Sequence, residues 1–448
     1  MSDLNSIFKA YDIRGVVPDQ LDAGTARAVG AAFARFTGAA QVLVARDMRP
    51  SGVDLSAAFA EGATSQGADV VDLGLASTDL LYFAAGRLDA PGAMLTASHN
   101  PARYNGIKLC LAGARPVGVD TGLVDIKAMV EKGVPPAGRT GSVSRLDLLT
   151  EFGAHVRSFA GTGPLRPLKI VADTANGMGG HVAPVVFAEL PFEVEYLYQE
   201  LDGTFPNHPP DPIQVENLRD LQARVLETGA DVGLAFDGDA DRVFLVNEKA
   251  ETVSGSSTTA LVAKGLLATN PGSTILHNLI CSKAVPEVIR EGGGTPVRTR
   301  VGHSFIKQTM LETGAAFGGE HSGHYYFRDN YRADSGLIAT MVVLEQISTA
   351  DQPLSALVAP LDRYAQSGEI NSPVTDPLAV IEAISERYAD GAQDRLDGLT
   401  VDFGDWWFNV RPSNTEPLLR LNLEAPDRAA CDARTAEVTA AIRAHGEG

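Results

Sequence analysis

Apolar runs alternate with polar turns and helical patterns along most of this chain. Residues 41–47 form a short apolar run, and the stretch after it, about 52–66, has the spacing of a helix. The same order starts again at 168–174 and at 273–279. Short apolar runs that alternate with helical stretches are typical of buried strands in α/β folds. The pattern therefore predicts three related α/β units at intervals of about 105–130 residues.

The C-terminal part follows a different pattern. Residues 406–410 and 418–423 both have the pattern of strands, and one helical pattern lies on each side of the pair. This order predicts a smaller α+β domain. Because 448 residues exceed what one hydrophobic core usually supports, we expect four domains, at residues 1–145, 146–249, 250–366 and 367–448.

A polar loop with a single serine follows the short apolar strand at residues 93–95. It reads Thr-Ala-Ser-His-Asn-Pro, and its Asn-Pro pair favours a turn that leaves Ser98 exposed. A hydrolase serine would need a base and usually a G-x-S-x-G elbow, which this loop lacks. We expect that His99 does not serve as that base, because neighbours in an extended segment point in opposite directions. The loop is therefore either a polar turn or a serine that carries a phosphoryl group.

Three carboxylates stand at alternate positions in residues 237–242, which read Asp-Gly-Asp-Ala-Asp-Arg. A calcium-binding EF-hand loop would have glycine where Arg242 stands, and helices where 232–236 and 243–246 have the pattern of strands. Converging carboxylates that leave coordination positions free for a phosphate oxygen suit Mg²⁺. The sequence therefore predicts a magnesium site made by Asp237, Asp239 and Asp241.

Two later loops contain donors and acceptors suited to a phosphorylated sugar. Residues 319–324 offer an acceptor, a hydroxyl and an imidazole for vicinal hydroxyl groups. Residues 411–417 offer a guanidinium that can hold a phosphate through two hydrogen bonds, together with further polar groups. Taken alone, each loop could also be an ordinary turn between strands. The candidate side chains are Glu320, Ser322 and His324 in the first loop, and Arg411, Ser413, Asn414 and Thr415 in the second.

In their order along the chain, these four loops resemble the phosphoserine, metal, sugar and phosphate loops of the α-D-phosphohexomutase superfamily. The resemblance is closest to its bacterial phosphomannomutase/phosphoglucomutase branch, and residues 8–15, 104–108 and 205–211 match further parts of that pattern. The departures are small: His321 occupies a variable position, and so does Pro412. The resemblance implies three mixed α/β sandwich domains and a TATA-binding-protein-like fourth domain around a central cleft.

The resemblance also implies an activity. Hexose 6-phosphate and hexose 1-phosphate, of mannose or glucose, would interconvert through a phosphoserine and a hexose 1,6-bisphosphate, which would also act as activator. One Mg²⁺ per active site would contact the phosphoserine. By the same resemblance, Ser98 carries the phosphoryl group and also contacts the metal. The resemblance implies that the other catalytic residues are Arg14, Lys108, Arg242 and His303. It also adds three residues to those that bind the substrate: Tyr11, His99 and Lys283.

Three other functions compete with this interpretation. A metal-dependent sugar phosphatase would share the phosphorylated intermediate, but its usual D-x-D-x-T motif is absent. A sugar-phosphate sensor would not need both a serine that can be phosphorylated and a complete set of metal ligands. Phosphoglucosamine mutase generally has another residue at the position of His321. The preferred sugar stays open.

Composition restricts the partners of the chain. Hydrophobic residues make up 44% and charged residues 21%, as in globular proteins. No stretch approaches the ~18 apolar residues of a membrane span. The first residues lack a signal-peptide pattern. Three scattered cysteines indicate no disulfide framework. We therefore expect a cytoplasmic protein. The net charge of −19 argues against nucleic-acid and membrane partners. We expect sugar phosphates as partners, bound where cations gather, and a monomer or small homo-oligomer.

Overall fold

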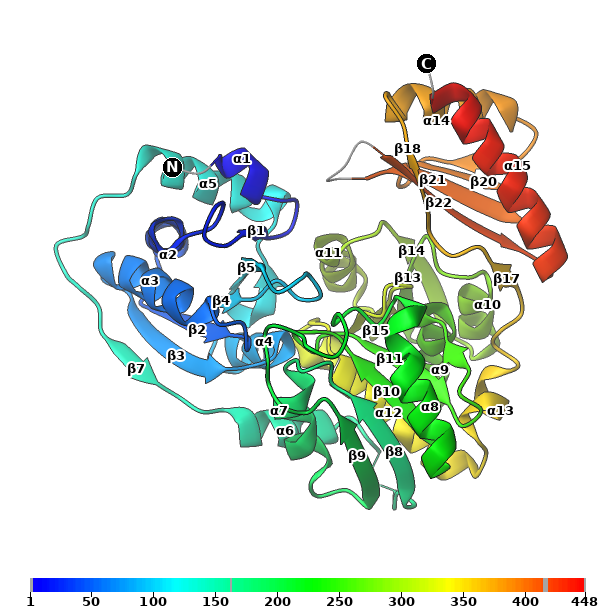
Figure 1. Ribbon diagram of the computed structural model, residues 1–448, viewed down its shortest axis with the longest axis horizontal. Helices are drawn as coiled ribbons and strands as arrows, with labels where there is room; N and C mark the ends of the chain where they lie inside the picture. The colour runs from blue at the N-terminus through cyan, green and yellow to red at the C-terminus, as the bar shows by residue number, and fades with distance from the viewer. Residues whose placement is uncertain (1–2, 162, 414–417, 447–448) are drawn as a thin grey trace.

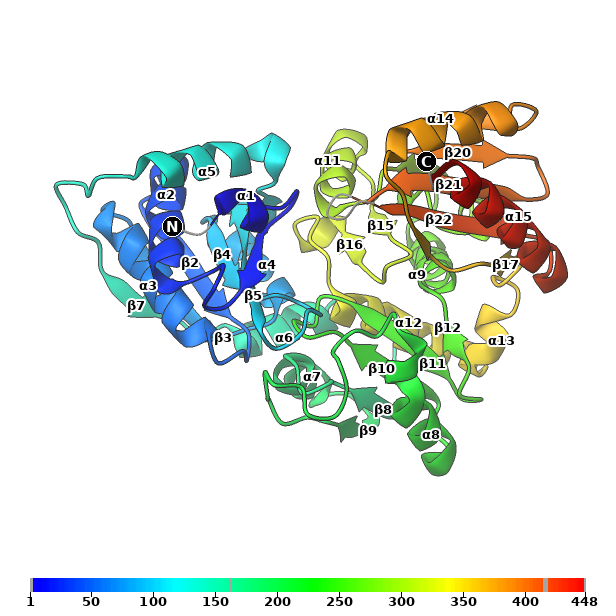
Figure 2. The same cartoon turned by 45° about the horizontal axis from the view of Figure 1, so that its top comes forward.

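The computed structural model describes residues 3–161, 163–413 and 418–446 as four successive domains (Figure 1). Each domain is built on its own sheet. Domains I and IV lie on opposite sides of the molecule, and domains II and III join them (Figures 1 and 2). The predicted fold class, three mixed α/β domains followed by a smaller α+β domain, is confirmed.

Domain I has a mixed sheet in the order β1-β5-β4-β2-β3-β7, with β6 paired to β5. Its central strand, Gln41–Arg46, is buried at all four inner positions, as expected for a strand covered on both faces by helices. The strands are β1 Ile13–Val16, β2 Gln41–Arg46, β3 Asp69–Leu75, β4 Gly92–Leu95, β5 Tyr104–Leu111, β6 Arg115–Pro116 and β7 Val143–Arg145, and the helices are α1 Leu4–Ile7, α2 Ala23–Thr37, α3 Gly52–Ser65, α4 Thr78–Arg87 and α5 Leu123–Lys132.

Domain II has the order β12-β11-β10-β8-β9, and β10 and β11 form an antiparallel hairpin around the predicted metal loop. Both hairpin strands are buried along their whole length. The elements are α6 Leu149–Arg157, β8 Leu168–Asp173, α7 Gly179–Phe187, β9 Phe192–Leu197, α8 Arg219–Thr228, β10 Val232–Phe236, β11 Val243–Asn247 and β12 Thr252–Val253.

Domain III has the order β14-β13-β15-β16, and the predicted sugar loop connects β15 to β16. The elements are α9 Gly255–Thr269, β13 Thr274–Asn278, α10 Ala284–Glu291, β14 Thr295–Thr299, α11 His303–Thr313, β15 Phe317–Gly319, β16 Tyr325–Phe327, α12 Gly336–Ala350 and α13 Leu354–Val358.

Domain IV is an antiparallel sheet whose two helices pack on one apolar core. The elements are β17 Ala365–Gln366, β18 Ile370–Pro373, α14 Pro377–Arg387, β19 Ala392–Asp394, β20 Leu399–Asp402, β21 Trp407–Pro412, β22 Leu418–Ala425 and α15 Arg428–Gly446.

Two short strands lie beyond the limits that the sequence predicted for their domains. β12 pairs with β11 and extends the domain II sheet past residue 249, and β17 pairs with β22 and starts the domain IV sheet before residue 367. Each strand has only two residues, so it has no apolar period that could mark it in the sequence.

The apolar cores divide the molecule differently from the sheets. One buried cluster runs through domains I, II and III and includes Leu43, Phe83, Phe236 and Leu337. The core of domain IV, around Phe408, is separate. Within the described residues, none of the helices combines the length and the apolar character needed to cross a bilayer.

Candidate active site

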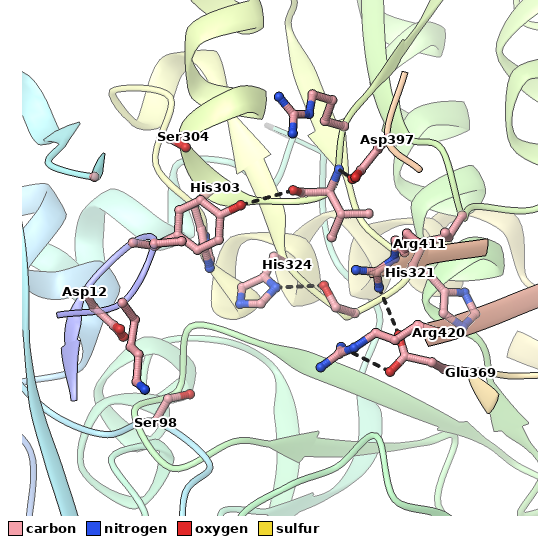
Figure 3. A pocket seen from close by; sticks show the side chains of 18 of the residues that line it. Asp12, Ser98, His303, Ser304, His321, His324, Glu369, Asp397, Arg411 and Arg420 are labelled. Carbon is pink, nitrogen blue, oxygen red and sulfur yellow. Dashed lines mark hydrogen bonds and ion pairs between the residues drawn. The ribbon is translucent and has the colours of Figure 1, made fainter. Parts of the chain in front are cut away.

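A cleft of about 1490 Å³ is lined by all four domains (Figure 3). Among the described residues, nine Lys and Arg line it, against five Asp and Glu. The cleft is therefore locally cationic, although the whole chain carries a net charge of −19. A concave surface lined by one sign of charge concentrates oppositely charged ligands. The geometry suits a substrate with anionic groups.

Ser98 lies at one end of this cleft, directly after β4. The prediction of an exposed serine is wrong, because only 5% of the residue is exposed. The metal loop of domain II covers it: Ser98 Oγ donates a hydrogen bond to Asp237 Oδ2 at 2.7 Å, and Arg242 Nη2 lies 3.4 Å from the same oxygen. The serine hydroxyl is therefore already in contact with the carboxylate loop.

The side chains of Ser98 and His99 point toward each other, which the sequence analysis did not expect. His99 Nδ1 lies 3.3 Å from Ser98 Oγ. Ser98 has a φ of 48°, in the left-handed region, and this turn brings neighbouring side chains together where an extended chain would separate them. Burial, Arg242 and Arg14 hold the pKa of His99 well below its ordinary value, so the ring beside Ser98 is neutral.

Arg49 holds the backbone of the serine loop, and sequence reasoning missed it. Its side chain is fully buried and donates to the carbonyl oxygens of Ser98, Asn100, Pro101 and Tyr104 at distances from 2.7 to 3.0 Å. Its Nε donates to the buried Asp47 at 3.2 Å. All five guanidinium hydrogens are thereby used. The signal in the sequence was a pair of opposite charges, two residues apart, directly after a buried strand.

The structure brings the three predicted metal ligands together in the turn between β10 and β11. Asp237, Asp239 and Asp241 are completely buried, and one oxygen from each lies within 4.8 Å of the others. Lys108 Nζ lies 2.7 Å from one oxygen of Asp239 and 2.7 Å from one of Asp241. In the part of the chain that the structure describes, the other oxygens of these two residues, both named Oδ1, have no hydrogen-bond partner. Buried acceptors without a donor fit a site for a hard cation.

The charges around these carboxylates show the same need for a cation. Burial raises the pKa of Asp237 well above its ordinary value, and although Arg242 opposes this, Asp239 and Asp241 add to it. Burial also acts to raise the pKa of Asp239, but Lys108 and the hydroxyl of Thr78 lower it. Thr78, at the start of α4, donates through Oγ1 to Asp239 at 2.5 Å, a contact that the sequence did not predict. Domain I therefore helps to fix the metal loop of domain II.

The predicted sugar-loop residues separate into two groups. Ser322 and His324 line the cleft, and Ser322 Oγ lies 2.9 Å from His324 Nδ1. Burial, His303 and Arg242 hold the pKa of His324 well below its ordinary value. Glu320 is 2% exposed and is not among the described residues that line the cleft. Its oxygens accept from Asn278, Gly302 and Tyr326.

Three of the other predicted residues, Tyr11, Arg14 and His303, also line the cleft. Tyr11 donates to the backbone oxygen of Val301 at 3.4 Å, which joins domain I to domain III. Arg14 pairs with Asp12 and donates to the side chain of Asn100. His303, at the start of α11, lines the cleft next to His324 (Figure 3).

One further cluster is close enough to hold a cation but already contains one. His303, His324 and Asp334 each place one possible ligand atom within 4.8 Å of the others. The ammonium group of Lys307 lies 3.0 Å from Asp334, whose carboxylate is buried. Because this lysine supplies the positive charge, we assign no metal to the cluster.

Paired arginines form the far end of the cleft. Glu369 lies between them: one carboxylate oxygen is 2.9 Å from Arg411 Nη2 and the other is 3.1 Å from Arg420 Nη1 (Figure 3). Arg420 was missed by the sequence analysis. The pairing register of the two predicted strands could have identified it, because β21 and β22 place Arg411 and Arg420 directly opposite each other. Ser413 donates through its backbone to Leu418, and the predicted Asn414 and Thr415 lie outside the described residues.

Lys283 was predicted to bind substrate, but its side chain points elsewhere in this structure. Its Nζ lies 2.6 Å from Asp402 Oδ1 and donates to the carbonyl oxygen of Gly404 at 2.8 Å. The residue is not among the described residues that line the cleft. Here Lys283 joins domain III to domain IV.

Four family descriptions match successive parts of the chain. They are the α/β/α domains I, II and III and the C-terminal domain of phosphoglucomutase/phosphomannomutase, at residues 5–134, 151–251, 254–364 and 369–441. These matches span most of the chain. The chain belongs to the phosphoglucomutase/phosphomannomutase family, as the resemblance of its motifs implied.

Individual relatives agree with this assignment. A phosphomannomutase of Salmonella montevideo is 40% identical over 446 residues, which cover 96% of this chain and 97% of that protein. A phosphomannomutase/phosphoglucomutase of Pseudomonas aeruginosa is 38% identical over 429 residues, covering 94% and 92%. The crystal structure of a family protein from Burkholderia thailandensis matches with a TM-score of 0.92 at 34% identity, covering 100% and 99%. The chain is a phosphohexomutase, and the predicted class of enzyme is confirmed.

Proposed function

We propose that this phosphohexomutase interconverts the 6-phosphate and 1-phosphate of mannose and glucose by way of a phosphoserine at Ser98. The observation that carries the proposal is the contact of Ser98 Oγ with Asp237 at one end of a cationic cleft whose other end has two paired arginines. The two sugars are proposed because similar proteins carry the names phosphomannomutase and phosphomannomutase/phosphoglucomutase.

Mg²⁺ is the metal that best fits the donor set. Asp237, Asp239 and Asp241 would hold it together with the phosphorylated Ser98. Three carboxylates and a phosphate oxygen are hard oxygen ligands of the kind that Mg²⁺ prefers. When bound, Mg²⁺ supplies positive charge that offsets the negative charge of the phosphoryl group during transfer.

The chain's own cations support the same reacting group. Lys108, which touches two carboxylates of the loop, and Arg242, which lies beside Ser98 Oγ, place fixed positive charge where the phosphoryl group moves. Phosphoryl transfer depends mainly on positioning and electrostatic stabilisation. Arg14 and His303 line the cleft nearby and are the candidates for moving the hydroxyl proton.

At the other end, Arg411 and Arg420 would hold the phosphate that does not react. Ser413, with Asn414 and Thr415, would add donors to this grip. Ser322 and His324 line the space between the two ends and would contact the sugar ring. After the first transfer, the hexose 1,6-bisphosphate turns round and returns its other phosphate to Ser98. Free hexose 1,6-bisphosphate would act as activator because it can rephosphorylate Ser98.

Product analysis tests this proposal against its alternatives. The purified protein is incubated with Mg²⁺, a trace of glucose 1,6-bisphosphate, and mannose, glucose or glucosamine 6-phosphate, and ³¹P NMR follows the products. We expect hexose 1-phosphate from mannose and glucose with little inorganic phosphate. Inorganic phosphate as the main product would support a phosphatase, and faster turnover of the glucosamine substrate would support phosphoglucosamine mutase.

A further inference from the structure

A buried tyrosine joins the sugar loop to the histidine at the start of α11. Tyr326, on β16, is fully buried, and its hydroxyl donates to Glu320 Oε2 at 2.8 Å. The same hydroxyl oxygen lies 2.7 Å from His303 Nδ1. Burial raises the pKa of Tyr326 well above its ordinary value, and the charges of Glu320 and Asp334 add to this, so the phenol keeps its proton.

The number of protons in this chain of contacts decides the direction of each hydrogen bond. A phenol has one hydrogen to donate, and Tyr326 donates it to the carboxylate of Glu320. Its contact with His303 therefore needs a hydrogen on Nδ1, which donates to the tyrosine oxygen. Tautomers are inferred from such networks of donors and acceptors. The network around Tyr326 selects the form of His303 that carries hydrogen on Nδ1.

A second acceptor on the same side of the ring agrees with this direction. Asp334 Oδ2 lies 3.5 Å from His303 Nδ1. Burial acts to raise the pKa of Asp334, but Lys307, 3.0 Å away, and His303 hold it well below its ordinary value. An ionised carboxylate only accepts hydrogen bonds. Asp334 therefore favours the same direction, since it can only accept a hydrogen from Nδ1.

In this tautomer the other ring nitrogen, Nε2, carries the lone pair. Tyr326 and Asp334 are completely buried behind the ring, whereas the side chain of His303 is 29% exposed and lines the cleft. We propose that Tyr326 is a positioning residue that fixes the tautomer of His303 with hydrogen on Nδ1. This inference rests on the function proposed above. This tautomer leaves Nε2 free to exchange a proton with a sugar hydroxyl.

The surroundings of the histidine ring define what else can influence it. Among the described residues, three rings meet His303 edge-on: Tyr11, His324 and Tyr326, with ring centres 6.4, 4.4 and 5.9 Å away. Tyr326 hydrogen-bonds His303 Nδ1, Asp334 lies 3.5 Å from the same nitrogen, and Lys307 lies 3.0 Å from Asp334. Tyr326 connects His303 to Glu320 through hydrogen bonds, whereas His324, whose Nδ1 lies 3.7 Å from Glu320 Oε2, meets His303 through a ring contact.

The test replaces Tyr326 with Phe, which removes one oxygen and keeps the ring. Nitrogen-15 NMR of histidine-labelled protein reads the tautomer directly, and a His303→Asn variant identifies the signals. In the unmodified protein we expect Nδ1 to have the shift of a ring nitrogen that carries hydrogen, and Nε2 that of a ring nitrogen without one. A wild-type ring with hydrogen on Nε2 and a bare Nδ1 would overturn the proposal.

In Tyr326→Phe we expect a mixture of both tautomers of His303 and a fall in kcat of about tenfold. KM should change less than twofold, because Tyr326 contacts His303 and is not among the described residues that line the cleft. Tyr325→Phe is the matched control, because it removes the same oxygen from the preceding residue of β16. The side chain of Tyr325 points to the opposite face of the strand and packs in a different apolar core. An unchanged tautomer and kcat in Tyr326→Phe would assign the positioning to Asp334 alone. The NMR experiment needs no turnover, so its outcome is separate from that of the product assay.

Discussion

The two ends of the cleft are built in different ways. At the reacting end, Ser98 and the three aspartates are almost completely buried, and domains I, II and III share one apolar core beneath them. At the far end, the arginines belong to a domain with its own core. The side chains of Arg411 and Arg420 are 10% and 30% exposed, and that of Glu369 is 31% exposed.

This contrast matches what each end has to do in the proposed reaction. The moving phosphoryl group always meets the same serine, so charges fixed in a buried site stabilise it with little reorganisation. The far end must accept a phosphate in two orientations of the sugar. The ion pair between Glu369 and Arg420 is about one third exposed on both sides, and exposed ion pairs contribute little energy. We therefore expect substitutions at the reacting end to cost more than substitutions at the far end.

The largest effect is expected for Asp239→Asn. The change removes one charge from the metal ligands and weakens the contact with Lys108, so kcat should fall on the order of 10³-fold, or about 4 kcal/mol. Steady-state kinetics at saturating Mg²⁺ measure this loss, and a chelator should abolish turnover until Mg²⁺ is restored. Asp211→Asn, a carboxylate 3.9 Å from Arg242 and outside the metal loop, is the control. An Asp239→Asn enzyme within tenfold of the original would contradict the metal assignment.

Arg49→Met should reduce stability most among changes beneath the reacting end. The change leaves Asp47 buried without its partner and frees four carbonyl oxygens of the serine loop. Breaking a buried ion pair costs about 3–5 kcal/mol. Urea unfolding measures the loss, and the double variant Asp47→Asn with Arg49→Met should recover part of it. A single variant as stable as the original would show that this ion pair does not hold the loop.

Asp79 gives the reacting end a stability that depends on pH. Burial raises the pKa of Asp79 to about 7, although Ser335 and Ser77 donate to it. Because its folded pKa lies above its unfolded value, the contribution of Asp79 to stability is lost as pH rises from about 4 to 7. The free energy of unfolding of Asp79→Asn, compared with that of the original protein, should therefore rise by about 2–3 kcal/mol between pH 5 and pH 7. Urea unfolding at both pH values measures this gain, and a difference that does not vary with pH would contradict it.

Smaller effects are expected at the far end. Arg411→Ala removes a charged contact to the phosphate that does not react, which is worth about 1.5–3 kcal/mol. KM should carry most of the loss, because the contact holds substrate and transition state alike. Arg420→Ala, on the more exposed partner, should lose less. A larger loss from either variant than from Asp239→Asn would reverse the comparison between the two ends.

Local patterns in the sequence predicted the α/β domains and the carboxylates of the metal loop, whereas the role of Ser98 followed only from the resemblance of the four loops to a known family. Buried strands such as 232–236 have a continuous apolar signal, and alternate aspartates in the turn that follows mark a metal loop. Contacts between distant residues could not be predicted in this way. Thr78 and Asp239 are 161 residues apart and meet because two domains pack together.

The same limit explains the wrong predictions around the serine. The exposure of Ser98 depends on how the domain II loop covers it, and the orientation of His99 depends on the left-handed turn at φ 48°. Neither property is visible in six residues of sequence. The contact of Lys283 with Asp402 of another domain was also not predictable from local sequence, and the substrate-binding role of Lys283 stays a prediction.

The central claim is that Ser98 carries the phosphoryl group between turnovers. Mass spectrometry of peptides from the purified protein, before and after incubation with glucose 1,6-bisphosphate, tests it most directly. We predict that a fraction of the peptide that contains Ser98 is heavier by one phosphoryl group, and that this fraction increases after incubation. The Ser98→Ala variant should lose this added mass and nearly all activity. A phosphoryl group found only on another side chain, or an alanine variant with full turnover, would contradict the account.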